Sequence, residues 1–229
     1  MIMKHTRSEF KQALHATNPT FFAYFPLGLV FGVLFTNAGF PWYQAPLMSA
    51  LVYAGAVQFI ALGMMINHNN LAAIILAALF VALRNSFYGL SLTERFKAAP
   101  RAVRMFLIFG LVDAAYAIFV SRPSKHGEND VAFCFYTTLL LYIYWVGGTL
   151  IGAMFAGSIP EVKGLEFVLT AFFAIIVIEH FLINKSTDAL FIPLAASCIA
   201  YTLLPQFYLL IAILLCAFYL YIKIKVIRS

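Results

Sequence analysis

An apolar run from Leu47 to Phe59 contains polar side chains that could bind a small solute. These are Ser49, Tyr53 and Gln58, and the Gln58 amide can both donate and accept hydrogen bonds. If Gly55 interrupts a helix here, the freed backbone groups could bind the charged ends of a solute. The small residues of the run suit close packing against another helix equally well. The run therefore predicts either a packing face or a substrate-binding segment.

Ionisable residues lie within other apolar runs. Arg84, beside Asn85, either extends its charged end to the membrane surface or pairs with a carboxylate, from a substrate or from Asp113. Asp113 lies about midway along its run, where a carboxylate has to be neutral, paired or in contact with water. Glu179 and His180 form either an interfacial polar cluster or a proton-titrating pair. Asp113, Glu179 and His180 are therefore the candidates for proton coupling.

Catalysis, metal binding and nucleic-acid binding are not expected. The sequence lacks the motifs of zinc proteases, serine hydrolases and P-loop enzymes, so neither an enzyme nor a cofactor is predicted. Cys134, Cys198 and Cys216 lie in apolar segments without ligand-like spacing and are predicted to be small buried hydrophobes. The net charge of +6 comes from Lys and Arg at segment ends, without a basic face interleaved with aromatics.

The composition assigns these residues to membrane-spanning elements. With 63% hydrophobic and 10% charged residues and a mean hydropathy of +0.92, the chain is predicted to be an integral membrane protein. Its 229 residues contain no linker, so residues 1–229 are expected to form one all-α polytopic domain of seven to eight hydrophobic helical segments. The apolar segments are 20–38, 46–66, 70–92, 103–120, 131–156, 165–184, 188–204 and 206–222.

The positive charges do not fit a simple count of crossings. Lys and Arg near both termini predict a cytoplasmic location for each, and the most basic loop, Arg95–Arg104, also belongs in the cytoplasm. Three apolar segments separate the N-terminus from this loop, which would place it outside. One solution is that segment 46–66 or 70–92 enters and returns, or is broken midway. The rival interpretation is seven or eight plain crossings with one misplaced basic loop.

A weak internal repeat supports the first solution. Gly28-Leu-Val-Phe-Gly32 resembles Gly148-Thr-Leu-Ile-Gly152, within repeats of about 19–92 and 139–204. Antiparallel halves would form two inverted repeats with broken or re-entrant helices, as in many secondary transporters. Gln58 and His180 would then be corresponding positions near the midplane.

Several segments resemble the AzlC family of branched-chain amino acid permeases. The resemblance lies in Tyr24–Gly32, Leu47–Phe59, Arg84–Leu92, Leu111–Ala117 and Gly164–Phe173. The chain departs from the family pattern where Asn85 replaces a common His, Ala114 a common acid and His180 a common Gln. The resemblance implies export of branched-chain amino acids by a large subunit that works beside a small AzlD-type membrane subunit.

The resulting expectation is a secondary transporter in the bacterial inner membrane that exports Leu, Ile, Val or Met, driven by the proton motive force. Gln58, Tyr53 and backbone near Gly55 would hold the zwitterion, with Arg84 facing its carboxylate and Asp113 its ammonium group. The alternative is a channel-like or structural subunit whose partner carries the substrate site. Assembly with further copies of the chain is left open.

Overall fold

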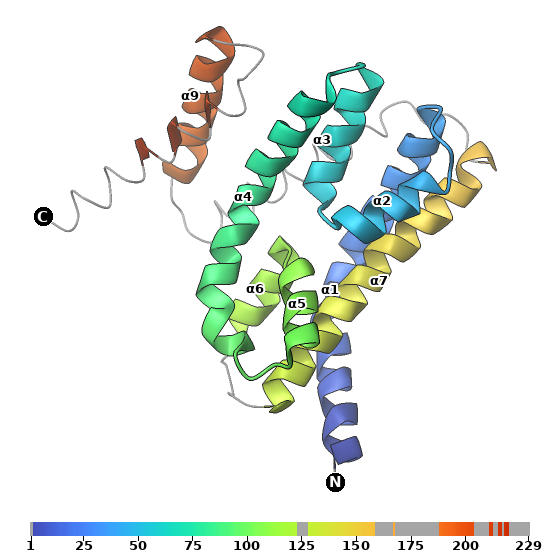
Figure 1. The fold of residues 1–229 in the computed structure, drawn as a ribbon, viewed down its shortest axis with the longest axis vertical. Coiled ribbons are helices and arrows are strands. Elements are labelled where there is room, and N and C mark those ends of the chain that lie inside the picture. Colours follow the sequence, from blue (N-terminus) through green and yellow to red (C-terminus); the bar gives the residue numbers. More distant parts are fainter. Residues whose placement is uncertain are drawn as a thin grey trace, which may run out of the picture. The chain divides into compact units, whose positions relative to one another are not determined.

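The computed structural model of the chain describes residues 2–122, 128–158, 167, 188–203, 211–212, 215–216 and 218–219. The chain divides into two compact units, Met1–Val168 and Leu169–Ser229, and each is described by itself. Across the described residues every regular element is a helix (Figure 1), which confirms the predicted all-α fold. In the second unit the main described element is α9 (Asp188–Leu203), which contains Pro193.

The first unit is built from helices of very different lengths. They are α1 (Ile2–Asn37), α2 (Gln44–Val52), α3 (Gly55–Ile66), α4 (Leu71–Phe96), α5 (Arg101–Phe109), α6 (Asp113–Ser121) and α7 (Glu128–Phe155), followed by the 3-10 turn η1 (Ala156–Ser158). Two stretches, Arg7–Asn37 and Asp130–Ser158, are long and apolar enough to cross a bilayer. Of the remaining helices, α4 bends by 57° between its two parts, and α5 and α6 meet at 114°.

Glycines bring α1 and α7 into direct backbone contact. A Cβ atom at Gly28 would lie 2.6 Å from the carbonyl oxygen of Trp145, and one at Gly152 would lie 2.0 Å from that of Leu29. No side chain fits at such distances, so the two backbones approach as only glycine permits. The same crowding applies to the other members of the two Gly-x-x-x-Gly motifs, Gly32 and Gly148.

The helices α1 and α7 run in the same direction. Near the start of α1, Phe10 packs against Tyr136 with ring centroids 5.4 Å apart, and farther along α1 the backbone at Gly32 meets that of Thr149. The two Gly-x-x-x-Gly motifs therefore form a parallel pair. The expected antiparallel relation does not hold for these two segments, and the rest of the proposed repeat beyond Ser158 is only partly described.

The helices α2 and α3 form a hairpin that enters and returns at one end of this unit (Figure 1). Near the C-terminus of α7, Ala45 of α2 packs in a cluster that includes Ala153. Tyr53, just after α2, contacts Tyr142, about three turns earlier in α7, with ring centroids 5.0 Å apart. The chain then returns along α3, because Leu62 rejoins the Ala153 cluster. Segment 46–66 is therefore broken and does not cross, as one of the two sequence interpretations predicted.

A second hairpin, α5 with α6, enters from the opposite end. Phe109 at the end of α5 reaches Tyr142, with ring centroids 6.3 Å apart. Arg122, just after α6, is back near the start of α7, where its guanidinium lies 3.8 Å from the ring centre of Phe133. The prediction of one uninterrupted segment over 103–120 is therefore wrong, because the chain turns back after Gly110.

Ion pairs connect the charged ends of four helices, α4 to α7 and α6 to α1. Arg95 of α4 donates to Asp130 of α7 through two bonds of 2.7 and 2.8 Å, and both side chains are buried. Arg122 donates to Glu9 of α1 over 3.3 Å. The connection between α4 and α5 therefore lies at the same end as the start of α1. The order of the helices gives the same result, because α1 crosses the unit, the α2–α3 hairpin returns to the end where it entered, and α4 crosses back.

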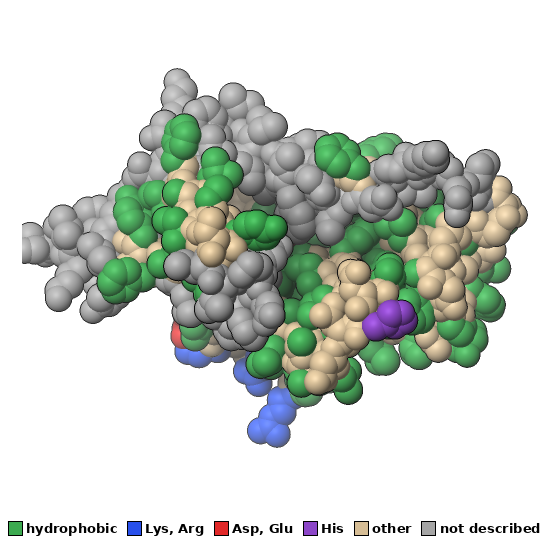
Figure 2. Space-filling model, turned by 90° about the horizontal axis from the view of Figure 1, so that it is seen from above, with side chains coloured by type: hydrophobic (Ala, Val, Ile, Leu, Met, Phe, Trp, Pro, Cys, Tyr) green, Lys and Arg blue, Asp and Glu red, His purple; other side chains and the backbone are tan. Residues whose placement is uncertain are grey.

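Among the described residues, the two ends of this unit differ sharply in charge. The connections at the end opposite the N-terminus, residues 38–43, 67–70 and 156–158, contain no Lys, Arg, Asp or Glu. Figure 2 looks onto this end and shows mostly hydrophobic and uncharged atoms among the described residues. The basic residues are instead concentrated at the end that carries the start of α1 and the Arg95–Arg104 loop.

Candidate functional site

The break between α2 and α3 leaves backbone groups free for a ligand. Tyr53 adopts a left-handed conformation with φ of 36°, which is uncommon for a residue other than glycine. Ala54 is extended, and α3 begins at Gly55 without a side-chain cap. The first N–H groups of α3 and the carbonyls of Leu51 and Val52 at the end of α2 therefore lack partners within their own helices. The helix is thus interrupted just before Gly55, the condition under which the sequence allowed a binding role for this backbone.

Gln58 is the centre of a buried hydrogen-bond network. Its amide nitrogen donates to the Ser49 hydroxyl over 2.9 Å, and its amide oxygen accepts from the indole N–H of Trp145 over 2.7 Å. Ser49 also shares a 2.9 Å hydrogen bond with the Thr149 hydroxyl. The network joins α2, α3 and α7 and holds the amide in one orientation. These contacts use one N–H and one oxygen lone pair of an amide that offers two of each.

Trp145 also fixes the position of the break. A Cβ at Gly55 would lie 2.7 Å from the Trp145 ring, so the start of α3 rests directly on the indole. On the other side of the break, the Tyr142 hydroxyl donates to the Ala50 carbonyl of α2 over 3.1 Å. Side chains of α7 thus support both arms of the hairpin.

The second break lies beside the first. A Cβ at Gly110 would lie 2.2 Å from the Thr138 methyl group, so the chain turns close against α7. Asp113 occupies the first turn of α6, where the helix N-terminus stabilises a negative charge. The ring of Tyr53, at the first break, lies 6.1 Å from that of Phe109, at the second. Two breaks from opposite ends therefore meet at one level of α7.

Two buried hydroxyls at these breaks have no hydrogen-bond partner among the described residues. They belong to Tyr53, at the first break, and Thr138, opposite Gly110 at the second. Buried polar atoms are normally paired, so each has capacity for a ligand or a water molecule. Asn85, on α4, likewise has a buried amide oxygen without a partner in the described part of the chain.

The structure brings together part of the predicted set of site residues. Ser49, Tyr53, Gly55 and Gln58 lie at the first break, and Asp113 lies at the second. Arg84 and Asn85 lie in α4 between its two straight parts, but the Arg84 side chain is not among those described. Glu179 and His180 fall outside the described residues, and so does the predicted approach of His180 to Gln58.

Sequence reasoning missed the contribution of α7. Trp145, Tyr142 and Thr138 all border the breaks, yet none is ionisable at neutral pH or unusual in an apolar segment. Thr149 lies within the Gly148–Gly152 motif, but the motif was interpreted as a repeat and not as a partner of Ser49. One available signal was the indole N–H, because a buried Trp needs an acceptor.

The arrangement can bind a small molecule with charges of both signs. The N-terminus of α3 presents N–H groups to an anionic group, and the ends of α2 and α5 present carbonyls to a cationic one. Asp113 adds a carboxylate at the same level. The fold and site thus define a polytopic membrane protein with a buried polar site between opposed broken helices.

Comparison with known proteins identifies the family. The AzlC protein family matches residues 19–159, so the chain belongs to this family. The branched-chain amino acid transport protein AzlC of Bacillus subtilis is 30% identical over 177 residues, which are 77% of this chain and 69% of that protein. A membrane protein of Helicobacter pylori is 30% identical over 208 residues, 90% of this chain and 91% of the relative. The inner membrane protein YgaZ of Escherichia coli is 30% identical over 177 residues, 71% and 69% of the two chains. No solved structure matches the chain.

Proposed function

We propose that this protein is a secondary transporter that exports branched-chain amino acids across the bacterial inner membrane. The name of the Bacillus subtilis relative supports the substrate class, and family membership supports a membrane transport role. Export as the direction, the proton motive force as the driving force and a small AzlD-type membrane subunit as the partner are further parts of this proposal.

The observation that carries the proposal is the meeting of two helix breaks at Tyr142. Tyr53 and Phe109, one from each break, both pack against this ring. An amino acid zwitterion matches the groups gathered there, since its carboxylate suits the N-terminus of α3 and the free N–H of Gln58. Its ammonium group suits Asp113 and nearby carbonyls. Aromatic and aliphatic side chains beside the breaks would surround the apolar side chain of the substrate.

An apolar pocket would discriminate weakly among these substrates. One methylene group in such a pocket changes selectivity by about 10- to 200-fold. We therefore propose overlapping transport of Leu, Ile, Val and Met.

The proposed coupling group is Asp113, in the first turn of α6 at the second helix break. A titratable carboxylate at a helix break can exchange a proton when the site opens to either side of the membrane. Glu179 and His180 remain second candidates for proton transfer. Arg84 and Asn85 are proposed to contact the substrate carboxylate from α4.

Reconstitution tests the proposal and its main rival. The purified full-length chain in liposomes should exchange external radiolabelled leucine for internal leucine, and valine and isoleucine should compete. If exchange needs an added small partner subunit and Gln58→Ala leaves its KM unchanged, the site belongs to the partner and this chain is a channel-like or structural subunit.

The same assay gives a prediction for Trp145. Trp145→Phe keeps the ring against Gly55 but removes the N–H that fixes the Gln58 amide. The amide oxygen then lacks a buried partner, which costs about 1–3 kcal/mol, so we expect the KM for leucine exchange to rise about tenfold or more. Trp42→Phe is the matched control, because Trp42 is exposed. Equal KM values for both variants and the wild type would show that the network does not orient a substrate group.

The charge asymmetry gives a prediction for topology. The positive-inside rule places both termini and the Arg95–Arg104 loop in the cytoplasm. In a background without Cys134, Cys198 and Cys216, an impermeant thiol reagent should label Asn69→Cys in intact cells and spare Ala98→Cys. Both positions are exposed, at opposite ends of the first unit. The reverse pattern would contradict the proposed orientation.

A further inference from the structure

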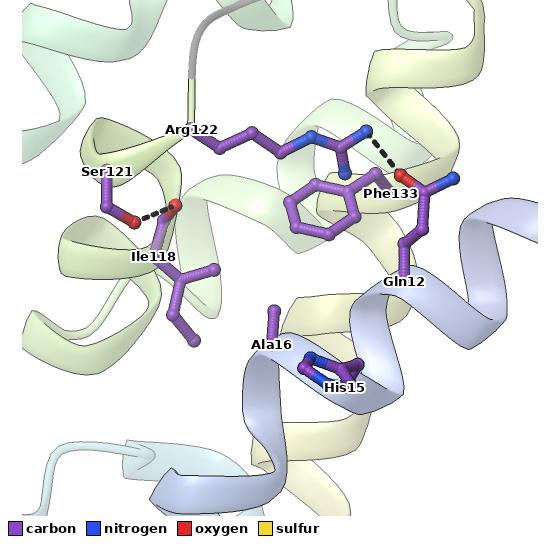
Figure 3. A pocket seen from close by; sticks show the side chains of 7 residues that line it. All are labelled: Gln12, His15, Ala16, Ile118, Ser121, Arg122 and Phe133. Atoms are coloured by element: carbon purple, nitrogen blue, oxygen red, sulfur yellow. Dashed lines mark hydrogen bonds between the residues drawn. The ribbon is translucent and has the colours of Figure 1, made fainter.

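A pocket of about 260 Å³ lies between α1, α6 and α7, away from the helix breaks (Figure 3). Gln12 and His15 of α1 line one side, Ser121 and Arg122 line the α6 side, and Phe133 of α7 lies between them. This volume is near the lower limit of small-molecule sites, about 300 Å³, so it suits a compact group. Because Gln12 and His15 are exposed, the pocket opens at the surface of the first unit.

Arg122 is held so that only part of its guanidinium is paired. Its Nη2 atom donates to Gln12 over 2.9 Å and to Glu9 over 3.3 Å. The central carbon of the guanidinium lies 3.8 Å from the ring centre of Phe133. Its Nη1 atom is buried and has no hydrogen-bond partner among the described residues. A guanidinium nitrogen left in this way lacks an acceptor, and an anionic oxygen is the strongest acceptor available to it.

The hydrogen bonds of the other polar groups in the pocket limit which donors a ligand can use. The Ser121 hydroxyl already donates to the Ile118 carbonyl, and the Gln12 amide nitrogen donates to Ser8 and Glu9. The imidazole of His15 is therefore the second donor available to an anion. The remaining wall is apolar.

The position of the pocket corresponds to the headgroup level of a membrane. Arg122 follows the end of α6, and Phe133 lies one turn after Asp130, where the membrane-spanning part of α7 begins. Lys11 is exposed one turn before His15 on the same face of α1. Phe22, two turns after His15 on the same face of α1, is 71% exposed and offers an apolar surface for acyl chains.

We propose that this pocket binds the phosphate headgroup of an anionic phospholipid, with Arg122 and His15 as its donors. The acyl chains lie along the exposed apolar surface of α1. Basic pockets between helices near a membrane surface recognise anionic lipids in this way. Glu9 is the one carboxylate in contact with the Arg122 guanidinium among the described residues, and its negative charge opposes the anion. Removing this charge should therefore strengthen binding.

Native mass spectrometry of the purified full-length chain tests the proposal. The probes are phosphatidylglycerol and phosphatidylcholine of equal chain length, and inorganic phosphate. We expect phosphatidylglycerol to bind about tenfold more tightly than phosphatidylcholine, and Arg122→Gln to weaken that binding about 10- to 100-fold, the value of a charge-assisted hydrogen bond. Arg101→Gln is the control, because it removes an exposed charge outside the pocket.

Two more variants keep the test decisive if Arg122→Gln does not fold. Glu9→Gln should tighten phosphatidylglycerol binding, and His15→Gln should weaken it. The proposal is overturned if the wild type shows no preference for phosphatidylglycerol or if these variants bind like the control. Displacement of the lipid by millimolar inorganic phosphate would assign the pocket to a soluble anion.

Discussion

Gly152→Ala should destabilise the protein by about 3 kcal/mol, which corresponds to a fall of about 10 °C in the melting temperature. The new methyl group would lie 2.0 Å from the Leu29 carbonyl oxygen, which belongs to the backbone of α1 and cannot rotate away. The two helices would have to separate, and the contacts between them would be lost along both Gly-x-x-x-Gly motifs. Thermal unfolding followed by size-exclusion chromatography in detergent measures the change.

The control lies in the same helix. Gly147→Ala adds the same methyl group where no atom lies within 4 Å, so its melting temperature should equal that of the wild type or exceed it slightly. Gly32→Ala should behave like Gly152→Ala, because its Cβ would lie 2.2 Å from the Thr149 carbonyl oxygen. If the Gly152→Ala and Gly147→Ala variants have the same melting temperature, the close α1–α7 contact is not the main support of the first unit.

These glycines also show what the sequence could and could not predict. The likeness of Gly28–Gly32 to Gly148–Gly152 was visible in the chain, but likeness does not say whether two segments are related by symmetry or pack together. The structure shows that they pack in parallel. Two segments more than a hundred residues apart pair only because the whole helix bundle brings them together, so a local sequence pattern cannot predict the pairing.

The helix breaks were predictable to different degrees. The basic Arg95–Arg104 loop favoured a segment before it that does not cross, and Gly55 beside polar residues was a candidate position for a break. The turn after Gly110 had no such signal, because residues 103–120 form an uninterrupted apolar run apart from Arg104 and Asp113. Asp113 was recognised as costly within a membrane, and the break gives the reason, since the residue lies in the first turn of α6.

The network around Gln58 illustrates a third limit. An amide in an apolar segment must find partners, so a buried polar cluster was predicted from Gln58 itself. Gln58 bonds Trp145, 87 positions away, and its neighbour Ser49 bonds Thr149, 100 positions away, so only the fold brings these partners together. The sequence therefore identified which residue needs a network without identifying the helix that supplies it.

The substitution Asp113→Asn should uncouple leucine transport from the proton gradient. Asparagine keeps the shape and the hydrogen-bonding capacity of the side chain but cannot exchange a proton. We therefore expect proton-driven leucine transport to fall about 100-fold or more, the contribution of a positioned proton-transfer group. Exchange of internal for external leucine needs no net proton movement, so its maximal rate should survive, with a higher KM because Asp113 also faces the substrate ammonium group in the proposed site. Both activities can be measured in one preparation of proteoliposomes, with and without an imposed pH gradient.

Glu94→Gln is the matched control for this change. Glu94 pairs with Lys97 at an exposed position, and such pairs contribute little, so both activities should remain at the wild-type level. An Asp113→Asn protein that responds to the pH gradient like the wild type would make Asp113 a structural partner of Arg84 and not the coupling group. A variant that fails to assemble would likewise contradict the prediction, and the coupling role would then pass to Glu179 and His180. A selective loss of the gradient response, with exchange intact, assigns proton transfer to the first turn of α6, because the substrate contacts at the other break would still be in place.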